Sequence, residues 1–325
     1  MKRSFILVFL TLMSVCFCSC APTDTTEDVI KFSSDSASAD GTWSFTDALG
    51  REVSLKTPQR VVSLYGSFAE TWMLAGGTLL ATTQDAVEER GLELGESVEI
   101  IGTVKNPDTE RIAALDPDFI ILSADIAAHV QLGALLEEMQ IPHAYFRVDT
   151  YQDYLGMLAG FCMLTGRLDC YEQYGECVEQ EIQKILEKIP EQTPAPRVLL
   201  IRAYSSGAKA KGADNLAGVI LNELHADNIV ERHDHLLEEL SMEAILAEDP
   251  DFIFVSVMGS NEEAMEALQA NLLDNPAWEG LKAVQNGNFI LLPKELFHYK
   301  PNARWAESYA YLAKLLYPDA MREED

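Results

Sequence analysis

The stretch from Leu168 to Ile189 reads LDCYEQYGECVEQEIQKILEKI. Its apolar and aromatic side chains recur at spacings of three and four, with Glu, Gln and Lys between them, which is the pattern of an amphipathic helix. Asp169 is a suitable N-cap and Pro190 ends the pattern, so we expect a helix of roughly 20 residues and about 30 Å. A rod of that length can hold two lobes apart.

An internal repeat flanks this helix. Residues 110–123 read ERIAALDPDFIILS and residues 243–256 read EAILAEDPDFIFVS, so nine of fourteen positions are identical at a constant offset of 133 residues. Each copy predicts a short helix that ends at Asp-Pro, followed by a buried strand. The period is far longer than the ~20–50 residues of solenoid repeats. The sequence therefore predicts an α/β fold of two parallel-sheet α/β lobes joined by one long helix.

The chain of 325 residues is long enough for two domains of ordinary size. We expect an N-terminal α/β lobe at residues 42–150, connecting helices at 151–196 and a C-terminal α/β lobe at 197–325. Residues 20–41 are rich in Thr, Ser, Asp and Ala and have almost no apolar pattern, which indicates a flexible tether.

Residues 1–19 have the pattern of a signal peptide, in which Lys2 and Arg3 precede a short apolar run. The following Ser19-Cys20 resembles the end of a bacterial lipobox, although Phe17 stands where that motif prefers Leu. We therefore expect an extracytoplasmic lipoprotein. Its only attachment to the cell membrane would be a lipid anchor on Cys20.

The net charge argues against one class of partner, nucleic acid, and the positions of the cysteines argue against a disulfide framework. The formal net charge is −28, and the loss of Lys2 and Arg3 changes it to −30, which argues against nucleic acid as a partner. Cys162, Cys170 and Cys177 lie in or beside the long helix, where they make a poor disulfide framework. Buried thiols are the simplest interpretation.

Motifs of common catalytic sites are absent from the sequence, which has no Gly-x-Ser-x-Gly elbow, no phosphate-binding Gly-Lys-Ser/Thr loop and no His-Glu-x-x-His. We expect a protein that is not an enzyme and has no metal site and no intrinsic cofactor. His233 and His235 have no third ligand nearby in the sequence. A surface hydrolase or chelatase with paired carboxylates is the enzymatic alternative, and an adhesin or scaffold is a third class.

Ligands of open α/β sheets bind at the loops that follow the carboxyl ends of the strands. In the N-terminal lobe these loops carry Tyr65, which could line the site or ligate iron, and Ser67. In the C-terminal lobe they carry cationic and aromatic side chains that suit an anionic ligand, namely Lys209, Lys211, His298, Tyr299, Lys300 and Arg304.

The sequence resembles the extracytoplasmic substrate-binding proteins of ABC importers, in the cluster that carries ferric siderophores, haem and cobalamin. The resemblance lies in TDALGREVSL, IGTVKNPDTERIAALDPDFII, LSMEAILAEDPDFIFV and YKPNARWAESYAYLAKLLYPD, and it covers about residues 44–318. It implies a ligand bound in a cleft between the lobes, with small lobe movement. It also implies an ABC permease dimer as partner, docked through one carboxylate on each lobe.

Glu110 and Glu243 occupy these docking positions. Each also lies in the first turn of a predicted helix, where the helix dipole favours a negative side chain, but their recurrence in both lobes favours docking. The expected cargo is a small metal complex, and we favour an anionic iron complex, a ferric siderophore before haem. Cobalamin and the zinc- or manganese-binding version of this fold are the alternatives, and in the latter Tyr65 replaces the first metal ligand.

Overall fold

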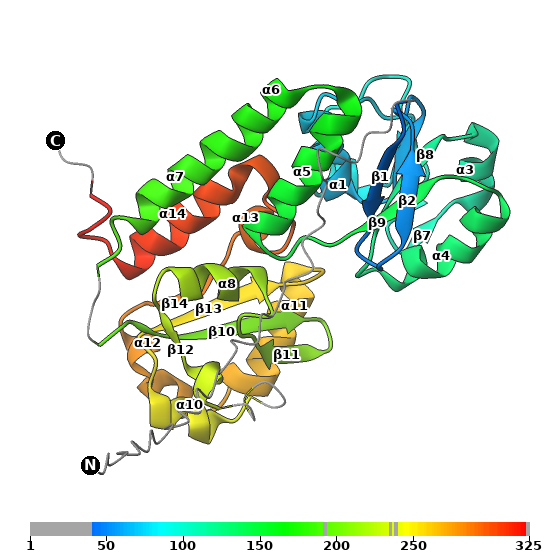
Figure 1. Cartoon of the computed structure of the whole chain (residues 1–325). Coiled ribbons are helices and arrows are strands. Elements are labelled where there is room, and N and C mark those ends of the chain that lie inside the picture. Colours follow the sequence, from blue (N-terminus) through cyan, green and yellow to red (C-terminus); the bar gives the residue numbers. More distant parts are fainter. Residues whose placement is uncertain (1–40, 191–193, 234–235, 237–239, 323–325) are drawn as a thin grey trace, which may run out of the picture.

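The computed structural model describes residues 41–190, 194–233, 236 and 240–322. It contains two α/β lobes with a layer of helices beside them (Figure 1). The predicted fold class, two parallel-sheet lobes joined by one long helix, is confirmed. The predicted signal peptide, Cys20 and most of the tether lie outside the described residues. Within the described ranges, no helix is both long enough and apolar enough to cross a membrane.

The N-terminal lobe is built on a parallel sheet in the order β5-β4-β3-β8-β9. Its strands are β3 (Val61–Ser63), β4 (Ala81–Thr82), β5 (Glu99–Ile100), β8 (Phe119–Ser123) and β9 (His143–Phe146). Its helices are α1 (Gly66–Leu74), α2 (Asp85–Glu88), α3 (Thr109–Leu115) and α4 (Ala127–Glu138). Antiparallel pairs join β1 (Trp43–Thr46) to β2 (Glu52–Leu55) and β6 (Gly102–Thr103) to β7 (Asn106–Pro107).

The C-terminal lobe has a sheet in the order β11-β10-β13-β14, with β12 also paired to β10. Its parallel strands are β10 (Arg197–Tyr204), β12 (Asp227–Asn228), β13 (Phe252–Val257) and β14 (Phe289–Leu291). Its helices include α8 (Leu216–Glu223), α10 (Met242–Glu248), α11 (Asn261–Leu268) and α12 (Lys282–Gln285).

The remaining strand of this sheet, β11 (Gly207–Ala210), is antiparallel to β10 and corrects one expectation. Lys209 lies on this strand and not on a loop, and Lys211 follows the strand directly. The backbone of Gly207 has φ of 150°, a conformation that glycine adopts readily and that lets the chain return after Tyr204. The loop predicted here is therefore a tight hairpin.

Both faces of each sheet are buried, and one apolar core runs through both lobes. In β10, Leu199 and Ile201 pack in a core on one face, whereas Val198 and Leu200 pack on the other, because successive side chains of a strand point to opposite faces. The core that contains Val198 also contains Val61 of the N-terminal lobe. A large separation of the lobes would expose this core to water.

The internal repeat forms the same joint in each lobe. The Asp118 carboxylate accepts a hydrogen bond from the backbone N of Arg60 at 2.8 Å, and the Asp251 carboxylate accepts one from the backbone N of Arg197 at 2.9 Å. Each carboxylate fixes the start of the lobe's first parallel strand against the strand beside it. The repeated Asp-Pro-Asp sequence is therefore a structural device of the fold.

The predicted long helix is present as three consecutive helical segments. These are α6 (Leu168–Tyr171), a π-helical turn (Glu172–Glu176) and α7 (Cys177–Leu186). Asp169 is not the N-cap, because it is the second residue of α6 and forms an ion pair with Arg167 at 2.7 Å.

Two more helices pack with this long helix. The first, α5 (Tyr151–Thr165), precedes it in the chain, and α14 (Trp305–Leu316) comes from the C-terminal end and runs along α7 (Figure 1). The rings of Tyr151 and Trp305 meet edge to face, with centroids 5.9 Å apart. The three helices form the layer that connects the lobes.

The cysteines of this layer are free thiols. Cys162 and Cys170 are buried, as predicted, and burial raises the pKa of Cys162 to about 12. The prediction is wrong for Cys177, which is exposed on α7.

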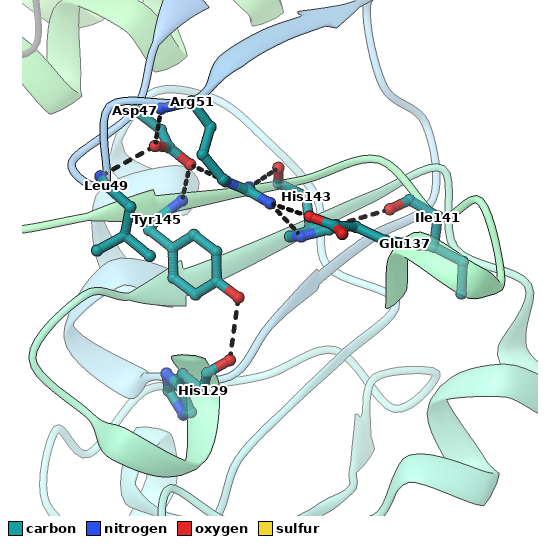
Figure 2. A network of polar contacts seen from close by, with 8 residues as sticks. All are labelled: Asp47, Leu49, Arg51, His129, Glu137, Ile141, His143 and Tyr145. Carbon is teal, nitrogen blue, oxygen red and sulfur yellow. Dashed lines mark hydrogen bonds and ion pairs between the residues drawn. The ribbon is translucent and has the colours of Figure 1, made fainter. Parts of the chain in front are cut away.

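A polar network holds the β1–β2 hairpin against the edge strand β9 (Figure 2). Asp47 accepts a hydrogen bond from Arg51 Nε at 2.9 Å, and Arg51 Nη1 lies 2.7 Å from His143 Nε2. Since guanidinium only donates, His143 Nε2 is the acceptor and Nδ1 donates to Ile141 O at 2.8 Å. Burial, followed by the charge of Arg51, lowers the pKa of His143. A pocket of about 350 Å³ beside this network is lined by Arg51, His143 and Glu137, which are already paired with one another.

The π-helical turn of the long helix is supported by two tyrosines of α5. Tyr151 Oη donates to Gly175 O at 2.7 Å, and Tyr154 Oη donates to Tyr174 O at 2.9 Å. Both accepting carbonyls lie in the turn whose backbone hydrogen bonds depart from the α-helical pattern. The two hydroxyls therefore stabilise an irregular segment in the middle of the connecting layer.

We expect the substitution Tyr154→Phe to lower the free energy of unfolding by about 0.5–1.5 kcal/mol, because it removes a hydrogen bond to the partly buried carbonyl of Tyr174. Urea unfolding of the purified chain measures the change. Tyr311→Phe is the control, since the Tyr311 hydroxyl has no hydrogen bond to a described residue. Equal stability of the two variants would contradict this role of Tyr154.

Candidate functional site

The segment from Lys294 to Arg304 leaves the C-terminal sheet after β14 and contacts the N-terminal lobe. It contains the short helix α13 (Lys294–Phe297) and a 3-10 turn (Asn302–Arg304). Asn302 Nδ2 donates to Ser67 O at 2.8 Å, and Lys300 Nζ bonds Asp149 Oδ1 at 3.1 Å. These contacts bring Tyr299 and Lys300 to the part of the N-terminal lobe that carries Tyr65 and Ser67, since Tyr65 and Tyr299 are both affected by the charges of Asp85, Glu89 and Arg90.

Tyr65 lies between β3 and α1, at the carboxyl end of its strand. Its ring packs edge-on against Phe68, with centroids 5.0 Å apart. Burial raises the pKa of Tyr65 to about 12, and the charges of Asp85 and Glu89 also raise it. The hydroxyl therefore stays protonated at neutral pH and can donate a hydrogen bond to a ligand. Phenolate ligation would require a metal to displace this proton.

Ser67 is buried beside the site and has a structural role there. The residue is 1% exposed, and its carbonyl accepts the hydrogen bond from Asn302. The buried Asp85 has a similar role, because its Oδ2 accepts from the backbone N of Gly66 at 2.6 Å and so orients the start of α1. Tyr65 is half-buried whereas Ser67 is buried, so Tyr65 is the predicted residue of this lobe with surface to offer a ligand.

Arg202 is a cation that sequence reasoning missed. It continues the row of Val198 and Leu200 along β10, so its side chain lies on the sheet face that carries the shared core. Lys209 lies directly opposite on β11. Like charges opposite each other destabilise an antiparallel pair, and neither cation forms an ion pair with a described residue. Arg202 Nε is also buried without a partner among the described residues.

An anion bound between Arg202 and Lys209 would remove this repulsion. The signal that could have found Arg202 is a single charged residue inside the apolar run LLIRAY. The other predicted cations already have carboxylate partners, since Lys211 pairs with Asp214 at 2.7 Å and Arg304 pairs with Glu307 at 2.8 Å.

His298 and Tyr299 lie in the segment that reaches the N-terminal lobe, and His298 is close enough to Arg202 to be affected by its charge. Burial, followed by the charges of Arg202, Lys294 and Lys300, lowers the pKa of His298 to about 4. The ring is therefore neutral at pH 7 in a locally positive environment. Tyr299 packs beside it, with ring centroids 5.2 Å apart, and burial raises the pKa of its hydroxyl.

Glu110 and Glu243 are the second residues of α3 and α10 and are exposed. Neither forms an ion pair with a described residue. Figure 1 places α3 and α10 on the outer parts of the two lobes, away from α7. Both carboxylates are therefore available to a partner.

Metal ligands do not gather in the described part of the chain. No group of three or more His, Cys, Asp and Glu side chains there could hold a metal ion. His233 Nε2 lies 2.6 Å from Glu248 Oε1, and His235 lies outside the described residues.

A family model described as periplasmic binding protein matches residues 61–296. The Fe(3+)-citrate-binding protein YfmC of Bacillus subtilis (strain 168) is 25% identical over 249 residues, covering 74% of this chain and 75% of that protein. The putative ABC transporter substrate-binding lipoprotein YhfQ of the same organism is 23% identical over 303 residues, covering 89% and 90%. The crystal structure of S. aureus IsdE complexed with heme has a TM-score of 0.66 at 17% identity, covering 79% of this chain and 98% of that one, and at this identity shows likeness of fold.

The positive environment of His298 can be tested without any ligand. We expect His298 to titrate near pH 4 by NMR, and Arg202→Met to raise its pKa because the substitution removes one of the neighbouring charges. His298→Gln identifies the signal. An unchanged pKa in Arg202→Met would contradict the proximity of the two side chains.

The same pKa shift has a consequence for stability. The pKa of His298 in the folded chain lies below the ordinary value of 6.5, so the unfolded chain takes up the proton first as the pH falls. The contribution of His298 to stability should therefore be lost between pH 6.5 and about 4, and His298→Gln should flatten the pH dependence of urea unfolding in that window.

Proposed function

The chain belongs to the periplasmic binding protein family, and from that premise we propose that it captures an anionic iron complex between its lobes and delivers it to an ABC import permease. A ferric siderophore is the first candidate and haem the second. The mature protein would be extracytoplasmic and anchored through a lipid on Cys20. The relatives named above are binding proteins, and the proposed role involves no catalysis.

The observation that carries this proposal is the cation pair of Arg202 and Lys209. Charge-assisted hydrogen bonds from a guanidinium and an ammonium are among the strongest that a protein offers an anion, and the guanidinium plane matches a carboxylate. The protonated hydroxyls of Tyr65 and Tyr299 can donate to the same complex. These groups favour an anionic complex over cobalamin, and Tyr65 in place of a first metal ligand disfavours the zinc or manganese alternative.

Delivery is proposed to use Glu110 and Glu243. Two exposed carboxylates without ion-pair partners among the described residues stand at equivalent places of two similar lobes. Such a pair matches a permease dimer that presents basic residues from each subunit. A role for each Glu in its helix dipole is the alternative, and it would be worth about 0.3–1 kcal/mol per site.

The anion proposal is tested by Arg202→Met with ferric citrate and haemin as probes. Loss of a charge-assisted contact of roughly 1.5–3 kcal/mol should weaken binding on the order of 10- to 100-fold, measured by quenching of intrinsic fluorescence. Affinity in the parent protein should also fall as salt rises. Lys314→Gln removes a positive charge from an exposed position of α14 and is the control. Full affinity in Arg202→Met, or binding that is independent of salt, would restore cobalamin as an equal candidate.

The docking proposal is tested by the double substitution Glu110→Ala and Glu243→Ala. We expect uptake of the iron complex by cells to be abolished, while affinity and melting temperature of the purified protein stay close to those of the parent. The control changes the same number of charges at Glu138 and Glu266, which are exposed elsewhere on the lobes. Normal uptake together with a loss of stability would instead support the dipole role.

A further inference from the structure

Asn302 is a buried residue in an unusual backbone conformation. It is 0% exposed and has φ of 54°, in the left-handed region where Asn is one of the few side chains tolerated. Its Oδ1 has no partner among the described residues, and a buried acceptor without a partner costs free energy. The left-handed backbone and the unpaired Oδ1 both reduce stability at this one position, which indicates that the position of the Asn302 amide has a role of its own.

The amide nitrogen of Asn302 binds the N-terminal lobe twice. Nδ2 donates to Ser67 O and to Glu70 Oε2, both at 2.8 Å, and both acceptors lie on α1. Glu70 is itself held by Arg90, whose Nε donates to the same Oε2 at 2.8 Å. The Arg90 side chain is 6% exposed. Asn302 therefore joins a partly buried ion pair, where a hydrogen bond to a charged group is stronger than a neutral one.

This link connects the two halves of the proposed ligand site. Tyr65 directly precedes α1, and His298, Tyr299 and Lys300 lie within four residues before Asn302. A shift of Asn302 relative to α1 would change the spacing between these two sets of side chains. The ion pair of Lys300 with Asp149 also spans the region, but the Asp149 side chain is 50% exposed, so solvent weakens that link.

We propose that Asn302 is a positioning residue that sets the spacing between the N-terminal and C-terminal halves of the site before the ligand arrives. Its effect on affinity rests on the proposed function, whereas its effect on lobe geometry does not. Without the link, only a fraction of molecules would hold both halves in place. The apparent Kd would then rise by the inverse of that fraction.

Asn302→Gly is the variant of choice, because glycine keeps the left-handed backbone and loses only the amide. Asn288→Ala is the control, since the Asn288 amide donates to Asp251 O at 2.9 Å entirely within the C-terminal lobe. Glu70→Gln is a second variant, which keeps an acceptor for Asn302 and Arg90 but removes the charge. If Asn302→Gly does not fold, Glu70→Gln still tests the link between Asn302 and α1.

The first measurement needs no ligand. Spin labels on Glu138→Cys and Glu262→Cys, in a Cys177→Ser background, report the distance between the lobes, because both positions are exposed and the other cysteines of the described chain are buried. We expect a narrow distance distribution in the parent and in Asn288→Ala, a broad one in Asn302→Gly and an intermediate one in Glu70→Gln. A distribution as narrow in Asn302→Gly as in the parent would overturn the inference.

The second measurement is affinity for ferric citrate and haemin. We expect Asn302→Gly to raise the apparent Kd roughly tenfold for whichever probe the parent binds, if the fraction of binding-competent molecules falls to about one tenth. Unchanged affinity beside a broadened distribution would overturn the positioning role. If Asn302→Gly broadens the distribution and the parent binds neither probe, the result would support Asn302 as the link between the lobes and count against the proposed function alone.

Discussion

The apolar core shared by both lobes is the constraint on which the rest of the structure depends. It passes from the N-terminal sheet through α5, α7 and α14 to one face of the C-terminal sheet. Burial of apolar surface contributes roughly 25 cal/mol per Å², so opening this core by even a few hundred Å² would cost several kcal/mol. The core therefore opposes a wide opening of the two lobes, and only smaller changes in their spacing, of the kind proposed for loss of the Asn302 link, remain accessible.

The internal repeat explains how two separate lobes come to present equivalent surfaces. Asp118 and Asp251 fix the start of the first parallel strand of each sheet against its neighbour, and the proposed ligand site lies at the opposite, carboxyl ends of these strands. The helix that precedes each joint carries Glu110 or Glu243 at the same position. One repeated segment thus determines both the sheet register inside each lobe and the place of a carboxylate outside it.

The fold class and the family resemblance could be predicted from the sequence, because both depend on patterns that are local or that recur. The amphipathic stretch marked the connecting helix, and the family model confirms the resemblance. The π-helical turn could not be predicted, because the hydroxyls that support it come from α5. Likewise, the hairpin that carries Lys209 depends on pairing with β10, and a loop was predicted in its place.

The candidate site in the structure differs from the predicted one for a related reason. The sequence alone shows which residues are neighbours along the chain. Arg202 becomes a ligand candidate only because strand pairing places it opposite Lys209. The net charge of −28 does not argue against an anionic ligand at Arg202 and Lys209. Charges beyond a Debye length of about 8 Å are largely screened, whereas two unit charges about 4 Å apart interact by roughly 4 kcal/mol near a protein surface. The proposal of an anionic ligand therefore rests on the local cations and is compatible with so acidic a chain.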